Sequence, residues 1–198
     1  MNEKVELSHG KKEAENGRYI PRLKKHYFEF VVPKMMEIFK YENPLQVPRI
    51  YKIVVNMGVG KWRNESGYID EAIQDLALIT GQKPAIKRAR KSIAGFQLKK
   101  GDISGLVVTL RNNMMYDFFD RLINVAMPRA KDFKGFYSSG FDGRGNYNIG
   151  IREHTIFPEV PYAKIKYVKG MNITIVTTAN NDQEAKELLK LMGMPFRD

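Results

Sequence analysis

The chain has 198 residues, of which 43% are hydrophobic, and its 33 Lys and Arg against 22 Asp and Glu give a net charge of +11. This size and apolar content suit one folded domain and argue against a globally disordered chain. The positive excess favours a polyanionic partner over an acidic small molecule. No apolar run reaches the roughly 18 residues of a membrane span, and the absence of cysteine excludes disulfides and thiolate metal sites.

Residues 1–18 are expected to form a disordered N-terminal extension, because they offer little apolar surface to bury. They contain no apolar stretch typical of a secretory signal, and their charges nearly balance. The net positive charge therefore belongs to residues 19–198, which we expect to fold as a single domain.

An amphipathic helix is predicted from Pro21 onward, since apolar residues recur at every fourth position as far as Phe39. Pro33 lies inside this pattern and should kink the helix or split it in two. Residues 50–60 then combine β-branched side chains with a closing glycine turn, which predicts a strand. A second helix is expected over residues 66–80, where apolar residues again follow a helical spacing.

Two further strands are predicted at residues 85–96 and 106–111, joined by a connection rich in turn-forming residues. A helix should follow, because apolar residues return to a helical spacing after Asn112 and Asn113. We expect one of these two asparagines to cap the helix and Pro128 to end it.

Residues 129–150 show no clear period and are expected to form a long loop rich in basic residues, glycine and aromatics. A strand rich in Thr and Ile is predicted at residues 171–178. The last helix should begin at Asn181, with a capping-box-like start that includes Glu184. This order predicts an α+β domain, in which helices pack on one face of a single, mainly antiparallel sheet and leave the other face free for RNA.

Catalytic motifs are absent from the sequence. No metal ligand lies at suitable spacing from any of the histidines, which favours structural or solvent-exposed roles for His9, His26 and His154. Residues 58–61 resemble the end of a phosphate-binding loop, but Val55 occupies the required glycine position and Trp62 the magnesium-binding Ser or Thr position. We therefore expect no enzyme, metal site or cofactor, apart from magnesium that RNA itself would hold.

The most basic segment spans residues 83–100, and no acidic residue interrupts it. Such a compact array neutralises phosphates and releases their counterions, so the segment predicts salt-dependent RNA binding. A solvated surface run is the alternative. The cations of the segment are Lys83, Lys87, Arg88, Arg90, Lys91, Lys99 and Lys100.

A second basic segment, residues 129–152, interleaves aromatic and basic residues with glycines. Its rings could stack on unpaired bases, fill a core beneath the loop, or face a protein. The rings in question are Phe133, Phe136, Tyr137, Phe141 and Tyr147, and the cations include Lys131, Lys134, Arg144 and Arg152.

Uncharged polar residues lie near the ends of the predicted elements, at Asn56, Gln82 and Thr109. Amides and hydroxyls can contact sugar hydroxyls and base edges, which gives discrimination between RNAs that Lys does not supply. The alternative for Asn and Gln at turns is that they satisfy backbone groups.

Several long motifs occur in order along the chain. They are QVPRIYKIVVNMGVG (46–60), LITGQKPAIKRARKSIAGF (78–96), VTLR (108–111), FDGRGNYNIGIRE (141–153), IFPE (156–159), TTAN (177–180) and GMPF (193–196). With these motifs the chain resembles the fifth protein of the large ribosomal subunit, the universal L-five family of bacterial or organellar type.

The resemblance implies a structural ribosomal protein that binds 5S rRNA and helps attach it in the central protuberance. It also implies contacts to large-subunit rRNA, to the peptidyl-site tRNA and, through an intersubunit bridge, to a small-subunit head protein. The ribosome would be cytoplasmic or organellar, and no membrane would be involved. A free regulatory RNA-binding module is the alternative, but the aromatic strand motif of RNA-recognition folds is missing.

Family positions can be transferred to this sequence residue by residue. The expected RNA-binding residues are Asn56, Met57, Gln82, Lys83, Lys87, Arg88, Arg90, Lys91, Ser92, Thr109 and Arg111. The expected tRNA-facing loop contains Lys99, Lys100 and Gly101. The expected bridge residues are Phe141, Asp142, Arg144 and Asn146.

One departure from the family concerns the loop at residues 101–105. The family usually has a Met-Pro-Ile core between glycines here, whereas this chain has Asp102, Ile103 and Ser104. The missing proline removes rigidity, and we expect Asp102 to add a negative charge near phosphate.

Overall fold

A five-stranded sheet lies at the centre of the part of the chain that the structure describes. The structure is a computed structural model that describes residues 19–60, 65, 67–96, 98–131, 133–161 and 165–197. The strands follow the order β2-β3-β1-β6-β5, and every neighbouring pair is antiparallel. They are β1 (Ile50–Gly58), β2 (Ala85–Arg88), β3 (Ile103–Leu110), β5 (Tyr147–Ile151) and β6 (Met171–Thr177). The predicted α+β class with a mainly antiparallel sheet is confirmed.

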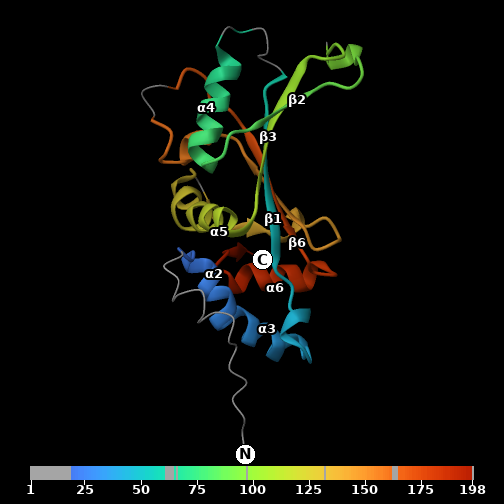
Figure 1. The fold of residues 1–198 in the computed structure, drawn as a ribbon, viewed down its shortest axis with the longest axis vertical. Helices are drawn as coiled ribbons and strands as arrows, with labels where there is room; N and C mark the ends of the chain where they lie inside the picture. The colour runs from blue at the N-terminus through green and yellow to red at the C-terminus, as the bar shows by residue number, and fades with distance from the viewer. Residues whose placement is uncertain are drawn as a thin grey trace, which may run out of the picture.

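Helices cover one face of this sheet and one of its ends. Figure 1 shows α4 and α5 beside the sheet, while α2, α3 and α6 gather at the end farthest from the β2–β3 projection. Their bounds are α2 (Arg22–His26), α3 (Val32–Phe39), α4 (Tyr68–Thr80), α5 (Asn112–Arg121) and α6 (Asp182–Leu191). Apolar side chains alternate inward along β1 and β6, so the core lies between these strands and the helices.

The N-terminal helical segment is divided, as its proline predicted. A π-helical turn, Tyr27–Val31, separates α2 from α3, and Pro33 is the second residue of α3. Because proline has no backbone N–H and crowds the preceding turn, a wider turn accommodates it without ending the helical path. The apolar residues that recur at every fourth position still face the core, where Tyr27, Val31 and Met35 are buried.

The helix caps agree with the sequence at one helix and differ at another. Asn181 caps α6, and its Oδ1 accepts the Glu184 N–H at 2.8 Å, as predicted. The predicted cap of α5 is wrong, because Arg111 occupies the cap position and Asn112 has a φ of 50°. Pro128 also does not end that helical region, since a 3-10 turn, Met127–Arg129, continues past it.

The segment expected to be a long loop contains regular structure. Besides β5, it holds β4 (Phe136–Tyr137), which pairs in parallel with β7 (Phe196–Arg197) as a second, two-stranded sheet. The predicted strand at residues 85–96 is too long, because the β2–β3 register shifts at Arg88 and the chain leaves the ladder. Residues 1–18, which were expected to form an extension, lie outside the described residues. So do Lys61 and Trp62, which were compared with a phosphate-binding loop.

Candidate RNA-binding surface

The sheet face opposite α4 and α5 carries a band of polar side chains. Asn56 on β1 lies opposite Asn172 on β6, and in the next row Val54 lies between Thr109 and Thr174. Partners in register point to the same face of a sheet. Asn56 and Asn172 are exposed. The predicted free face therefore presents amides and hydroxyls across the three central strands.

Of the predicted polar contacts, Asn56 and Thr109 share this open face. Gln82 follows α4 directly after Gly81, and its side chain is exposed while its backbone N–H bonds to the Thr80 hydroxyl at 3.3 Å. The side chain of Met57, also among the predicted contacts, is 0% exposed and lies on the opposite, core-facing side of β1, so it is not part of the open face. Adjacent residues of a strand point to opposite faces, so Asn56 and Met57 cannot both reach one ligand.

Three further polar residues extend the open face and were not predicted as contacts. Asn172 and Thr174 lie on β6, and the Thr174 hydroxyl donates to the Asn148 side chain of β5 at 2.7 Å. The signal was present in the sequence, because MNITIVT and YNIGI alternate apolar and polar residues. Such alternation predicts a strand with one open face, and its polar positions belong to that face.

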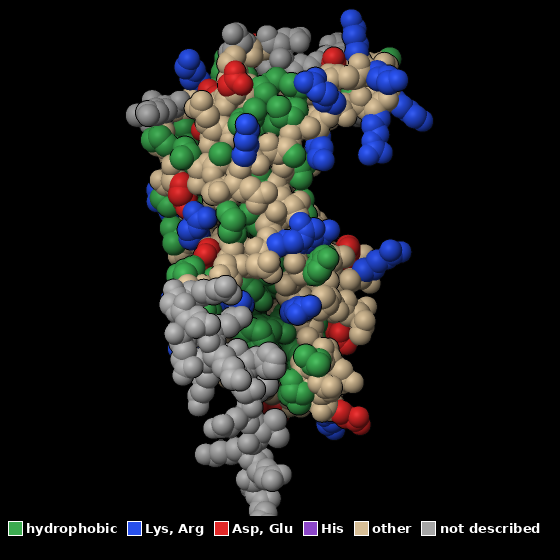
Figure 2. Space-filling view, viewed as in Figure 1, with side chains coloured by type: hydrophobic (Ala, Val, Ile, Leu, Met, Phe, Trp, Pro, Cys, Tyr) green, Lys and Arg blue, Asp and Glu red, His purple; other side chains and the backbone are tan. Residues whose placement is uncertain are grey.

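A basic arm, defined as residues 83–102, continues from this sheet. Figure 1 shows β2 and its connection to β3 projecting away from the side that α4 and α5 cover. Figure 2 shows Lys and Arg side chains fanning out from this projection above a hollow in the surface. All of its predicted cations are exposed, namely Lys83, Lys87, Arg88, Arg90, Lys91, Lys99 and Lys100. Arg111, at the far end of β3, is exposed as well.

Backbone hydrogen bonds hold the basic arm together beyond the end of β2. Ala89 donates to the Asp102 carbonyl at 2.8 Å, and Gly101 donates back to the Ala89 carbonyl at 2.9 Å. Ile93 and Leu98 then exchange two bonds around a 3-10 turn, Ala94–Phe96. The cations therefore stand on a bonded hairpin, and less conformational entropy is lost when they meet a partner.

Three side chains of the arm also form hydrogen bonds with its backbone. The Asp102 carboxylate accepts the Lys99 N–H at 2.9 Å, the Ser92 hydroxyl accepts the Lys100 N–H at 3.0 Å, and Arg88 donates to the Gly101 carbonyl at 3.0 Å. Asp102 therefore has a structural role that the sequence did not predict. The hydrogen bond that its carboxylate accepts from Lys99 restrains this loop. It therefore replaces part of the rigidity that we expected the loop to lack without a proline.

The predicted bridge residues form a tightly bonded turn. The Asp142 carboxylate accepts the N–H of Arg144 at 2.9 Å, the N–H of Asn146 at 3.1 Å and the Asn146 amide at 2.8 Å. The Asn146 amide, together with these backbone donors, holds the pKa of Asp142 below its usual value. Asp182 on α6 accepts the N–H groups of Gly143 and Gly145. Asp142 and Asn146 thus stabilise the turn through their hydrogen bonds, while the Arg144 side chain is exposed and makes none of these bonds.

Most aromatic rings of residues 129–152 belong to the core. Phe136 and Tyr147 are 4% and 3% exposed, and Phe141 packs between Tyr147 and Phe196. Burial raises the pKa of Tyr147 to about 12, and its hydroxyl donates to the Tyr137 carbonyl at 2.6 Å. Of the outcomes considered for these rings, the structure assigns core filling rather than base stacking. Tyr137 differs, since it is 58% exposed.

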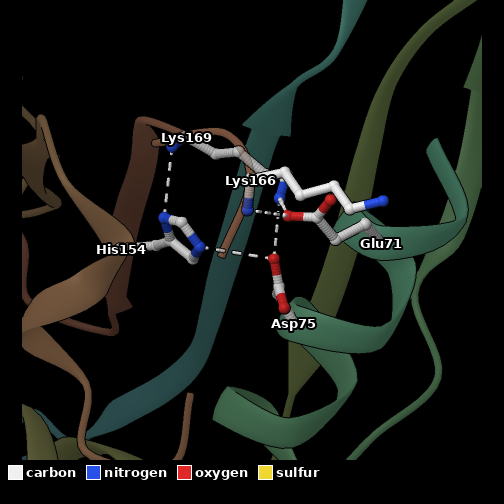
Figure 3. Close-up of polar contacts among 5 residues, drawn as sticks. All are labelled: Glu71, Asp75, His154, Lys166 and Lys169. Carbon is white, nitrogen blue, oxygen red and sulfur yellow. Dashed lines mark hydrogen bonds and ion pairs between the residues drawn. The ribbon is translucent and has the colours of Figure 1, made fainter. Parts of the chain in front are cut away.

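A cluster of buried charges joins α4 to the segment before β6 (Figure 3). Lys169 Nζ lies 2.6 Å from Glu71 Oε1 and 2.8 Å from Asp75 Oδ2. His154 Nδ1 accepts the Lys169 N–H at 3.1 Å, which places the ring proton on Nε2, 3.3 Å from Asp75 Oδ2. Burial acts to raise the pKa of Asp75, but His154 and Lys169 outweigh burial and lower it. His154 therefore has a structural role.

The other histidine that the structure describes, His26, also contacts a group of the protein itself. His26 is partly buried and its Nε2 lies 3.0 Å from the Leu191 carbonyl. Over the described ranges, no group of His, Asp and Glu side chains is arranged to hold a metal ion. Within the same ranges, no helix has the length and apolar character that crossing a membrane requires.

An open polar sheet face joined to an exposed basic arm defines an RNA-binding protein of the α+β class. Family comparison gives the particular group: residues 43–99 match the model of ribosomal protein L5, and residues 103–196 match the model of the C-terminus of the same ribosomal family. The chain belongs to the ribosomal L5 family and is a protein of the large ribosomal subunit.

Similar proteins cover almost all of the same region. The "Large ribosomal subunit protein uL5" of Syntrophomonas wolfei is 56% identical over 89% of this chain and 99% of its own length. Proteins of the same name from Geotalea daltonii and Desulfosudis oleivorans are 55% and 53% identical, over 89% and 88% of this chain and 99% and 98% of their own lengths. All three sources are bacteria.

Proposed function

We propose that this protein binds 5S rRNA and attaches it to the central protuberance of the large ribosomal subunit in the bacterial cytoplasm. The observation that carries the proposal is the junction of two surfaces with different chemistry. The basic arm provides cations for phosphates, and the open face provides Asn56, Thr109 and Asn172 for sugars and base edges. Its role is structural rather than enzymatic, and any magnesium belongs to the RNA.

Different parts of the surface serve different contacts. Lys83, Lys87, Arg90 and Lys91 lie along the exposed arm, where they can neutralise several phosphates of rRNA at once. Their charge gives affinity for any RNA, so discrimination falls to the polar side chains of the open face and to Gln82. Membership of the L5 family favours this ribosomal role over a free regulatory RNA-binding module.

Two further contacts, to the peptidyl-site tRNA and to a small-subunit head protein, are predicted from the family resemblance alone. Lys99, Lys100 and Gly101, on the returning side of the arm, would contact the peptidyl-site tRNA, and hydrogen bonds to the Asp102 carboxylate and the Ser92 hydroxyl hold the backbone of Lys99 and Lys100. The turn at residues 141–146 would form the bridge to a small-subunit head protein, with Arg144 as an exposed cation.

A binding titration against 5S rRNA and a length-matched random RNA, each at two salt concentrations, tests the proposal. We expect tighter binding to 5S rRNA that persists at the higher salt, because hydrogen bonds from the open face depend less on salt than phosphate contacts do. Equal binding to both RNAs that disappears at the higher salt would leave only a general polyanion-binding surface and would contradict the proposal.

A further inference from the structure

A pocket of about 290 Å³ lies along β5, at one edge of the five-stranded sheet. Beneath it lie the buried rings of Phe136 and Tyr147, and its lining includes the ring of Tyr137, which is 58% exposed. Its outer wall contains Ser139 and Asn148, both exposed. The pocket thus sets one exposed aromatic ring, Tyr137, beside a small number of hydrogen-bonding groups, which is a composition suited to a small planar ligand.

The pocket is continuous with the open face of the sheet. Asn148 lines the pocket and also belongs to the polar row, where its Oδ1 accepts the Thr174 hydroxyl at 2.7 Å. Its amide nitrogen stays available to a ligand, since Oδ1 is the atom that Thr174 uses. β5 is an edge strand, so part of its backbone N–H and C=O groups point away from the sheet towards the pocket side.

The charges around the pocket fit a nucleic acid. Lys134 lies between the lining residues Phe133 and Gly135 and is exposed, as are Arg129 and Lys131 on the segment that leads to it. The Arg197 guanidinium lies 4.6 Å from the centre of the exposed Tyr137 ring at the pocket wall. Cations beside a planar apolar pocket match a phosphate backbone from which one base turns inward.

We propose that this pocket binds an unpaired nucleobase of the RNA that lies on the open face. The inference rests on the proposed function, because the pocket is reached from the same surface. The base would stack on the exposed Tyr137 ring and use its edge to hydrogen bond with Asn148 and Ser139. Its volume suits one ring system rather than a longer stretch of nucleotides.

The proposal can be tested by filling the pocket with a side chain. Ser139→Trp places an indole at the pocket wall, whereas Ser138→Trp makes the same change at an exposed neighbour that does not line the pocket. For Ser139→Trp we expect about tenfold weaker 5S rRNA binding, the loss of one base contact, with an unchanged salt slope because no cation is removed. Ser138→Trp should bind as the unchanged protein does.

Chemical probing of 5S rRNA in the complex gives a second readout. One unpaired base should be protected by the unchanged protein and by Ser138→Trp, and should become reactive again with Ser139→Trp. Equal protection and affinity for both variants would overturn the pocket assignment while the selective binding of 5S rRNA stood. Unchanged 5S binding together with weaker subunit association for Ser139→Trp would overturn it in favour of a protein side chain. A failure of the proposed function is separate, because the unchanged protein would then not prefer 5S rRNA.

Discussion

The buried charge cluster and the basic arm use the same kinds of side chain in opposite surroundings. In the cluster, Lys169 is 2% exposed and meets two carboxylates within 2.8 Å. Along the arm, seven cations are exposed over residues 83–100, where the sequence contains no acidic residue. A buried charge must be paired inside the protein, because removing it from water has a large energetic cost. An exposed charge without such a partner remains available for phosphate.

This contrast separates residues that maintain the fold from residues that meet a partner. Glu71 and Asp75 on α4 fix the segment before β6 through Lys169, so their loss should affect stability. Arm cations such as Lys87 and Lys91 stabilise little in the free protein, so their loss should affect binding. Variants in each region should therefore change one property and leave the other nearly unchanged.

The largest effect should come from Lys169→Met, which leaves Glu71 and Asp75 without their buried cation. We expect a loss of about 3–5 kcal/mol in the free energy of unfolding, measured by urea denaturation. Lys166→Met is the matched control, because that side chain is exposed and only its backbone N–H bonds to Glu71. A loss below about 1 kcal/mol for Lys169→Met would mean that the ion pairs of Lys169 with Glu71 and Asp75 are no stronger than surface ion pairs. That result would contradict the stabilising role given to the buried cluster.

The next effect concerns the arm. Changing Lys87, Arg88, Arg90 and Lys91 together to Ala should reduce the slope of log affinity for 5S rRNA against log salt by about three to four, because each phosphate contact contributes roughly 0.7–0.9. The free energy of unfolding should stay close to that of the unchanged protein. An unchanged salt slope in the RNA titration would remove these residues from the phosphate contacts.

A smaller effect is expected at the open face. Asn56→Ala should weaken 5S rRNA binding by about 0.5–1.5 kcal/mol, the contribution of a hydrogen bond to a neutral group, with little change for random RNA. Parallel titrations with both RNAs measure the difference. Thr178→Ala, at an exposed hydroxyl beyond the end of β6 that bonds to the Arg49 backbone, provides a control outside the polar rows. Equal losses for both RNAs would contradict a discriminating role for Asn56.

The smallest effect is a pH dependence of stability. Since the pKa of Asp75 is lowered in the folded state, its stabilising contribution is complete above the usual carboxyl pKa of about 4 and is lost as the pH falls through the lowered value. Urea denaturation from pH 6 down to about 2.5 should therefore show the stability gap between the unchanged protein and Asp75→Asn narrowing. A constant gap over this range would contradict the role given to Asp75.

Local patterns predicted much of the fold. The alternation and β-branching of β1 and β6, the four-residue stripe of the first helices and the Asn181 cap all act within a few residues of sequence. The basic arm was evident for the same reason, since its cations are consecutive in the chain. Asn56 and Thr109 were expected separately, but only the β1–β3 register shows that they share one face.

Long-range contacts explain what could not be predicted. Lys169 and Asp75 are far apart in sequence, and a lone lysine gives no sign of burial. The strand β4 is only two residues long and exists because β7, near the C-terminus, pairs with it. The rings of Phe136 and Tyr147 looked available for stacking until the fold placed them beneath the turn. Asp102 likewise gained its role from the arm hairpin.

Lysine-reactivity footprinting of the complex with 5S rRNA tests most directly where the RNA lies. Acetylation rates of each lysine would be compared in free and bound protein. Protection should concentrate on Lys83, Lys87 and Lys91, while Lys34 on α3 and Lys190 on α6, which lie on helices away from the arm, should react as in the free protein. Protection of Lys34 and Lys190 with unchanged reactivity along the arm would contradict the assignment of RNA binding to the arm and open face.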